Sequence, residues 1–390
     1  MPVINSFADL QPDVVAWRHD LHENPELQFD THRTSASVAD RLRGFGCDEV
    51  VEGIGRTGVV GVIRGRATGS GRVIGLRADM DALPLTEVTG LPHASKTPGA
   101  MHACGHDGHT SMLLGAARHL AQTRGFDGTA IVIFQPAEEG GGGGREMVRD
   151  GLMERFGIQE VYGMHNRPGL AVGAFGIRPG PLMAATDIFR IEVRGRGGHA
   201  AFPHLCVDTT LAASQIVVAL QSVASRSVDP LKSVVLSVTG FRTDSMADNV
   251  IPEHAELVGT VRTFDPDIQA HVETRMTEIV AGTAAAAGVR AALSYERNYP
   301  VTVNDPAKTD FAAAVARDVA GDGLVDADFP PTMGAEDFSY MLEARPGAMI
   351  WVGNGDSAAL HNPAYDFNDH AIPFGCSYWV RLVETAMPAG

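Results

Sequence analysis

Residues 73–79 read Val-Ile-Gly-Leu-Arg-Ala-Asp, a short apolar run that ends in charged residues, as a buried strand does where it reaches the rim of a sheet. Apolar residues then recur with helical spacing from Thr110 to Leu120, and Thr129–Phe134 is again strand-like. Further strand-like runs occupy Val161–Met164 and Met349–Val352. Strands that alternate with helices predict an α/β fold with a mostly parallel sheet covered by helices.

The middle of the chain follows a different pattern. The order strand, helix, strand, strand, helix, strand is typical of a ferredoxin-like (βαββαβ) unit. We therefore expect an inserted domain at residues 184–295, and one larger domain formed by residues 1–183 and 296–390. The predicted elements of the insertion are Ile188–Val193, Asp208–Ala224, Val234–Thr239, Ala255–Thr263, Asp267–Ala286 and Val289–Tyr295.

Composition excludes several classes of partner. The 390 residues carry a net charge of −16, so no basic surplus is present to bind nucleic acid or an anionic membrane. The N-terminal residues lack the pattern of a signal peptide and no apolar run reaches the length of a membrane span, which predicts a cytoplasmic protein. The cysteines are too scattered for a disulfide framework, and they are Cys47, Cys104, Cys206 and Cys376.

One short segment concentrates metal donors. Residues 101–109 read Met-His-Ala-Cys-Gly-His-Asp-Gly-His, with five possible donors and two glycines that let the backbone bend. In an extended segment Cys104 and His106 would face the same side, because they are two residues apart. We take these two as ligands and interpret His102 and His109 as structural, with His109 at the start of the next helix.

Other donors follow separate strands. Glu138 and Glu139 come after the strand that ends at Phe134, and His165 and His361 follow later strands. The carboxyl ends of strands line the ligand crevice of open α/β sheets, so these donors are expected to meet. Thiolate, imidazole and carboxylate together favour zinc or a similar first-row divalent ion. Five ligands exceed what one tetrahedral ion takes, which predicts two ions.

The adjacent glutamates suit a division of roles. Because neighbouring side chains diverge, one can bind metal while the other faces a bound water. A solvated acidic pair at a strand end is the simpler interpretation. The glycines at 140–144, which bring backbone close to another group, favour the functional one.

Six ordered motifs resemble the M20 metallopeptidase family, and within it the amidohydrolase branch of hippurate hydrolases, bacterial aminoacylases and plant auxin-conjugate hydrolases. The resemblance implies that Cys104, His106, Glu139, His165 and His361 bind a dinuclear metal site. The motifs are RADMDALP (77–84), MHACGHDGHT (101–110), QPAEEG (135–140), GMHN (163–166), GGHAA (197–201) and LHNP (360–363).

The resemblance also implies roles outside the ligand set. Glu138 is expected to be the general base, and Asp79 to orient a ligand. The inserted domain is expected to be a lid and dimerisation domain, in which His199 and Asn249 contact substrate. Arg262 is a candidate partner for a substrate carboxylate, with an exposed charge on a strand as the alternative.

Two residues depart from the family pattern. Arg145 follows the glycine run where a small residue is more usual, and Cys206 replaces a small residue after Pro203-His204. Both positions bear on substrate preference rather than on metal chemistry.

The resemblance therefore implies a homodimeric hydrolase that cleaves the amide bond of small N-acyl amino acids with two divalent ions, from among Zn, Mn, Co or Ni. A dipeptidase or carboxypeptidase of the same fold is an alternative. Two other classes stay open, namely a cysteine hydrolase with Cys104 as the nucleophile and a non-catalytic metal-dependent binding protein.

Overall fold

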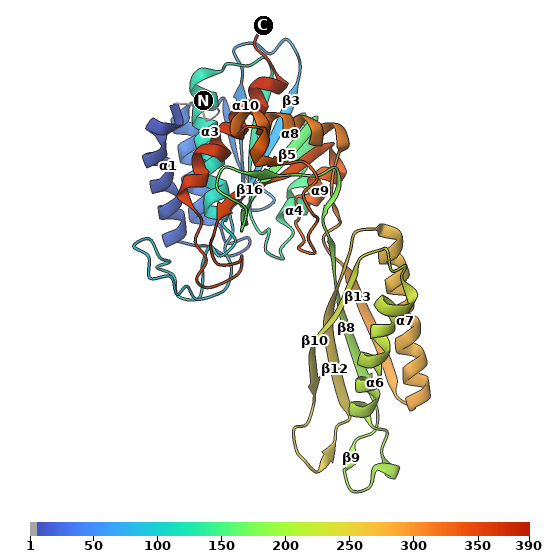
Figure 1. The fold of residues 1–390 in the computed structure, drawn as a ribbon. Helices are drawn as coiled ribbons and strands as arrows, with labels where there is room; N and C mark the ends of the chain where they lie inside the picture. The colour runs from blue at the N-terminus through green and yellow to red at the C-terminus, as the bar shows by residue number, and fades with distance from the viewer. Residues whose placement is uncertain (1–5) are drawn as a thin grey trace. The chain divides into compact units, whose positions relative to one another are not determined.

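The computed structural model describes residues 6–390, which form two compact units. Unit 1 comprises residues 1–182, 302–330 and 337–390, of which the first five lie outside the described residues. Unit 2 comprises residues 183–301 together with the short segment 331–336, which the sequence pattern did not associate with the insertion. Figure 1 shows the ribbon of both units.

Unit 1 is built on a sheet of eight strands among the described residues. In chain order they are β1 (Glu49–Ile54), β2 (Gly58–Arg64), β3 (Val73–Asp79), β4 (Thr129–Gln135), β5 (Glu160–Pro168), β6 (Phe175–Gly176), β15 (Val325–Asp326) and β16 (Gly347–Gly355). Across the sheet the order is β1-β2-β4-β3-β5-β16-β6-β15. The central strands β4, β3, β5 and β16 are mutually parallel, which confirms the predicted mostly parallel sheet.

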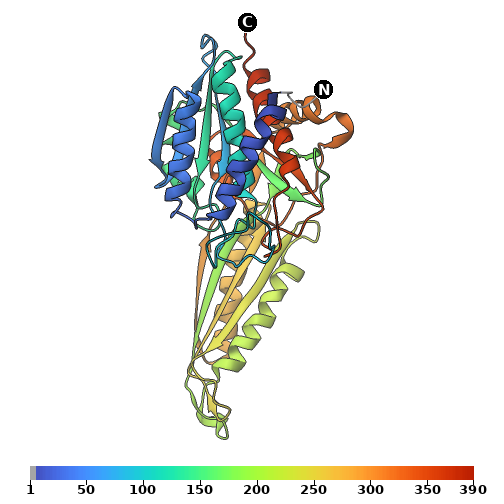
Figure 2. The ribbon, with the colours of Figure 1, turned by 90° about the vertical axis from the view of Figure 1, so that its left-hand side faces the viewer.

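Helices cover both faces of this sheet. They are α1 (Ser6–Glu23), α2 (His32–Phe45), α3 (His106–Thr123), α4 (Gly143–Arg149), α5 (Leu152–Arg155), α8 (Pro306–Ala320), α9 (Ser339–Ala344) and α10 (Ile372–Ala386). On one face α3 packs against α1, α2 and α10, and α10 also packs against α8 (Figure 2). The other face carries α4 and α9, which pack on each other.

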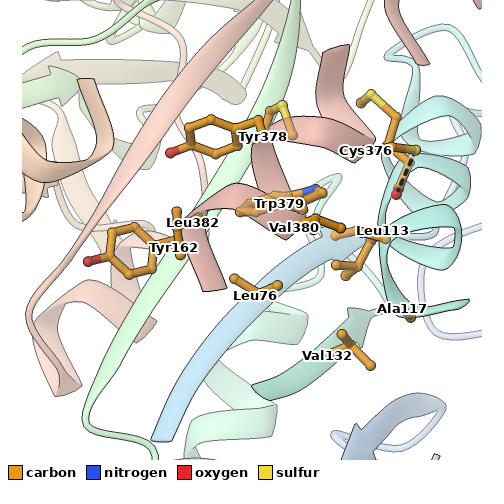
Figure 3. Close-up of a cluster of buried hydrophobic side chains, with 14 of the residues drawn as sticks. Leu76, Leu113, Ala117, Val132, Tyr162, Cys376, Tyr378, Trp379, Val380 and Leu382 are labelled. Atoms are coloured by element: carbon orange, nitrogen blue, oxygen red, sulfur yellow. Dashed lines mark hydrogen bonds between the residues drawn. The ribbon is translucent and has the colours of Figure 1, made fainter. Parts of the chain in front are cut away.

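The main core lies between the parallel strands and the α3–α10 pair. Figure 3 shows Leu76 and Val132 from neighbouring strands beneath Leu113 of α3 and Trp379 of α10. Trp379 is 1% exposed and the three aliphatic side chains are completely buried. Burying such side chains contributes about 1.5–3 kcal/mol each, so this layer stabilises the packing of the helices on the parallel strands.

Unit 2 contains a four-stranded antiparallel sheet with two helices on one face. Its strands are β8 (Ala185–Arg194), β10 (Val234–Thr243), β12 (His254–Thr263) and β13 (Arg290–Arg297), and its helices are α6 (Thr209–Ser222) and α7 (Pro266–Ala287). The sheet order is β10-β12-β8-β13, and the elements succeed one another along the chain in the predicted order βαββαβ. Two-residue strands β9 (Gly198–His199) and β11 (Val250–Ile251) pair separately.

The burial pattern explains this arrangement. Along β8 buried and exposed residues alternate, so Phe189, Ile191 and Val193 face the helices. Gly259 lies opposite Phe189, and a Cβ there would fall 2.3 Å from the Phe189 ring, so only glycine fits.

Two local predictions were wrong. The segment from Cys104 to His106 is not extended, because Gly105 adopts a left-handed conformation (φ 88°) and α3 begins at His106 rather than His109. The glycine run, by contrast, does bring backbone close to other groups, because a Cβ at Gly144 would lie 2.7 Å from the backbone oxygen of Asp337. Its last two residues also begin helix α4 at Gly143.

The remaining strands are short. β7 (Gly180–Met183) and β14 (Thr302–Asn304) form a two-stranded ladder where the chain passes from one unit to the other along the sequence. Among the described residues, no helix combines the length and the apolar character that crossing a bilayer demands.

Candidate metal centre

The structure brings the five predicted ligands together in unit 1. Cys104, His106 and His165 form one group whose donor atoms all lie within 4.8 Å of one another. Cys104 also groups with Glu139 and His361 within the same limit, and the Cys104 Sγ is 3.4 Å from His165 Nε2. These side chains come from β5, from the start of α3 and the residues just before it, and from the segments that follow β4 and β16.

In two of the candidate histidine ligands a hydrogen bond fixes Nδ1, so that Nε2 is the nitrogen available to a metal. His106 Nδ1 lies 2.8 Å from the backbone oxygen of Asp81, and His165 Nδ1 lies 2.8 Å from that of Asn166. Each Nδ1 therefore donates, which leaves Nε2 as the nitrogen that can bind a metal. Among the described residues the buried His106 Nε2 has no hydrogen-bond partner, as expected of an atom whose ligand is a cation.

The electrostatics of the cluster also suit a cation. Burial, together with the charges of Glu139, Glu138 and Asp79, raises the pKa of the Cys104 thiol well above its usual range. Burial lowers the pKa of His106, but the carboxylates of Asp79 and Asp81 outweigh it and bring that pKa to about 10. Divalent ions would relieve this concentration of negative charge and displace both protons, so the donors fit such ions.

The same field disfavours Cys104 as a nucleophile. A catalytic thiol needs a lowered pKa, normally from a nearby cation or a helix N-terminus. Cys104 is instead buried beside carboxylates, which disfavour the thiolate.

Sequence reasoning missed Asp81. Its two carboxylate oxygens accept the backbone N–H groups of Glu138 and Glu139, at 2.9 and 3.1 Å. Its backbone oxygen is the acceptor for His106 Nδ1. One residue thus orients both glutamates and one imidazole. The signals in the sequence were its position two residues past Asp79, beyond the end of β3, and its place in the motif RADMDALP (77–84).

Asp79 is a buried carboxylate that fixes His109 next to the candidate ligands. It is completely buried and lies 2.6 Å from His109 Nδ1, while His109 Nε2 accepts the backbone N–H of Asn166. Burial raises the pKa of Asp79, but the nearby cationic groups His106 and Arg77 outweigh it, so that pKa lies well below its usual range. Both ring nitrogens of His109 are therefore engaged in hydrogen bonds, although His109 also meets the distance criterion for a metal group with Asp79 and His106.

His361 arrives on a loop. Its backbone adopts a left-handed conformation (φ 63°), which is uncommon for a residue other than glycine, and its N–H donates to Ala103 O at 2.8 Å. Its imidazole Nε2 is 3.2 Å from Glu139 Oε1. Ala137, directly before Glu138, is also left-handed (φ 55°), so backbone strain gathers at the site, as is common for functional residues.

Unit 2 contains the three predicted substrate residues. His199 pairs with Val250 across β9 and β11, so His199 lies beside Asn249, whose backbone oxygen accepts the N–H of Ala200. Arg262 lies near the far end of β12, and at about 3.4 Å per residue the strand separates it from His254 by roughly 27 Å. The structure therefore brings His199 and Asn249 together and leaves Arg262 apart from them within the unit.

Comparisons with known proteins find relatives that match almost the whole chain. The family model for peptidase family M20/M25/M40 matches residues 75–385. The chain is 42% identical to a hippurate hydrolase of Campylobacter jejuni, over 98% of both chains, and 39% identical to an N-acetylcysteine deacetylase of Bacillus subtilis, over 95% of both. A solved structure of the YXEP protein from Bacillus subtilis, described as a dinuclear metal-binding peptidase, superimposes with a TM-score of 0.84 at 34% identity over 97% of this chain and 99% of that one. The chain belongs to the M20/M25/M40 peptidase family.

Proposed function

We propose that this protein is a metal-dependent amidohydrolase that cleaves N-acyl amino acids into a carboxylic acid and an amino acid. One observation carries the proposal: five donors suited to a divalent ion converge within reach of Glu138, a carboxylate that metal binding alone would not require. The relatives named above include a hippurate hydrolase and a deacetylase of an N-acetyl amino acid, which act on this substrate class.

The proposed roles follow from the placement of the residues. Cys104, His106, Glu139, His165 and His361 would hold two ions, which when bound lower the pKa of water from about 16 toward neutrality. Glu138 accepts the proton of the attacking water and later returns it to the leaving amine nitrogen, because an unprotonated amide nitrogen leaves very poorly. Asp79 orients His109 next to the candidate ligands through its contact with His109 Nδ1.

The finer assignments extend this proposal. The ions are zinc, manganese, cobalt or nickel, which all accept this mixture of sulfur, nitrogen and oxygen ligands. The protein acts in the cytoplasm as a homodimer, with residues 184–295 as its lid and dimerisation domain. There His199 and Asn249 contact substrate, and His199 stabilises the oxyanion that forms on the attacked carbonyl; Arg262 is the candidate for a substrate carboxylate.

The test is a substrate screen on the chelated and reconstituted protein. Hippurate, N-acetyl amino acids, indole-acetyl conjugates and dipeptides would each be assayed with Zn, Mn, Co and Ni. We expect turnover of N-acyl amino acids that EDTA or phenanthroline abolishes and one of these metals restores. Turnover of dipeptides alone would assign the chain to the dipeptidase or carboxypeptidase alternative.

Glu138→Gln tests the general base directly. General acid–base groups contribute about 100- to 10,000-fold, so kcat should fall by at least about 100-fold while metal content and fold persist. Glu146→Gln is the matched control, because this glutamate pairs with Arg145 and Arg149 outside the metal cluster. A Glu138→Gln protein with more than about a tenth of normal kcat would remove Glu138 from the role.

Two other classes make different predictions. A cysteine hydrolase would keep its activity in chelator. A metal-dependent binding protein would bind N-acyl amino acids in a calorimeter without releasing product.

A further inference from the structure

A second buried carboxylate anchors the loop that presents the two glutamates. Asp337, which directly precedes the Phe338 N-cap of α9, is completely buried. One of its oxygens accepts from Gln135 Nε2 at 2.7 Å and from Arg77 Nη2 at 3.0 Å. Its other oxygen accepts the backbone N–H of Gly144 at 2.7 Å. Asp337 thus contacts the residue before the loop and a residue at its end.

Arg77 closes this arrangement into a network. Its Nε donates to Gln135 Oε1 at 2.9 Å, and its Nη1 donates to Asp79 Oδ2 at 2.9 Å. The guanidinium therefore lies between two carboxylates, and none of the three charged side chains has exposed surface. A buried charge is stable only when paired and hydrogen-bonded, so each member restricts the position of the others.

The loop between these anchors carries the proposed chemistry. Gln135 ends β4, residues 136–142 follow, and Gly144 lies in the first turn of α4. Glu138 and Glu139 stand in the middle, with their N–H groups on Asp81. The loop is thereby held at both ends by one carboxylate and at its centre by another.

The end of the loop is fitted closely to its anchor. A Cβ at Gly144 would lie 2.7 Å from the backbone oxygen of Asp337 and 3.1 Å from Gln135 Oε1. Only glycine allows this approach, so the contact between Gly144 and Asp337 is a specific feature of the sequence rather than a loose surface bond.

We propose that Asp337, together with Arg77 and Gln135, is a positioning residue that fixes the Glu138–Glu139 loop for catalysis. It acts through the backbone of the loop. Its carboxylate also lies within 4.8 Å of the Glu138 carboxylate, so hydrogen exchange in the loop, and not kcat alone, reports the positioning role. The catalytic part of this inference rests on the proposed amidohydrolase function, whereas the structural part concerns the loop alone.

Asp337→Asn is the decisive variant. Asparagine offers one acceptor, and we expect Arg77 to retain it, so that an NH2 group faces the Gly144 N–H. Arg77 remains paired with Asp79, so the variant should fold without an uncompensated buried charge. Glu160→Gln is the matched control, because Glu160 is also a buried carboxylate, paired with Arg72 and Lys308 at the opposite end of β5 from His165.

Two measurements on the metal-loaded protein separate positioning from stability. In Asp337→Asn, amide hydrogen exchange in residues 136–147 should accelerate by about 10- to 100-fold, the loss expected for one buried charge-assisted hydrogen bond. Its kcat for an N-acyl amino acid should fall by about 10- to 100-fold with KM unchanged. Glu160→Gln should lower thermal stability without changing either quantity.

Each outcome decides one part of the inference. Unchanged exchange in the loop would refute the positioning role. Faster exchange with normal kcat would refute its catalytic consequence. If the wild-type protein hydrolyses no amide, the proposed function fails, and the exchange measurement still decides whether Asp337 fixes the loop. Gln135→Met removes the two hydrogen bonds of the uncharged partner and keeps the ion pairs, so it should accelerate exchange less than Asp337→Asn. An effect of the same size would assign the anchoring to Gln135 instead.

Discussion

The buried histidine His22 should make the stability of the protein fall at alkaline pH. His22 is completely buried, with Nδ1 2.8 Å from Asp107 Oδ2 and Nε2 3.3 Å from Glu87 Oε2. Burial lowers the pKa of His22, but the carboxylates of Asp107 and Glu87 together outweigh burial, and the pKa rises from 6.5 to about 9. The folded protein therefore holds this proton more tightly than the unfolded chain does.

The sign and size of the effect follow from linkage. A group whose pKa is raised on folding stabilises the protein fully below its unfolded pKa of 6.5, and this contribution disappears as pH rises through about 9. At about 1.4 kcal/mol for each pH unit, the difference corresponds to about 3 kcal/mol. The loss should be concentrated between pH 6.5 and 9.

Urea unfolding in EDTA at several pH values between about 6 and 10 would measure this contribution. The free energy of unfolding of the wild type should exceed that of His22→Gln by about 3 kcal/mol more at the acid end than at the alkaline end. His370→Gln, which changes an exposed histidine of unit 1, is the control for the other groups that titrate in this range. Parallel curves for the wild type and His22→Gln would refute the reasoning.

Three further predictions concern single contacts. Cys104→Ala should lower the metal content measured by elemental analysis, because a donor shared by two groups is lost; unchanged stoichiometry would contradict its role as ligand. Asp81→Asn should reduce kcat or metal affinity by about 10- to 100-fold, because its NH2 group would face one of the two backbone N–H groups that Asp81 now accepts. Asp48→Asn is the control and should change neither quantity, because Asp48 accepts a backbone N–H far from the cluster in sequence. Gly108→Ala should destabilise the protein by about 1–3 kcal/mol in urea unfolding, because the new Cβ would fall 2.3 Å from the buried Phe367 ring; normal stability would mean that this ring moves freely.

Local patterns in the sequence were sufficient for much of the fold. Apolar runs marked β3, β4, β5 and β16, because buried parallel strands are almost uniformly apolar. The donors that follow these strands could therefore be assigned to one rim before the structure was known. Alternating burial along β8 and β12 likewise made the elements of unit 2 recognisable.

What the sequence could not provide depends on contacts between distant residues. Cys104 and His106 converge through a left-handed glycine rather than an extended strand, and alternation along a strand does not describe that geometry. Asp337 is 193 positions from Gly144, so no local pattern links them. The role of Asp81 was equally hidden, since a carboxylate that accepts backbone N–H groups leaves no periodic signal.

The order of strands in unit 1 has a consequence for biosynthesis. β16 lies in the interior of the sheet, between β5 and β6, yet it is translated after all of residues 183–301. A chain emerging from the ribosome therefore displays β5 with one unfilled edge while the intervening residues fold as a unit of their own. His361 follows β16, so the last of the candidate donors is also translated after those residues. Assembly of the proposed cation site therefore follows the synthesis of residues 183–301.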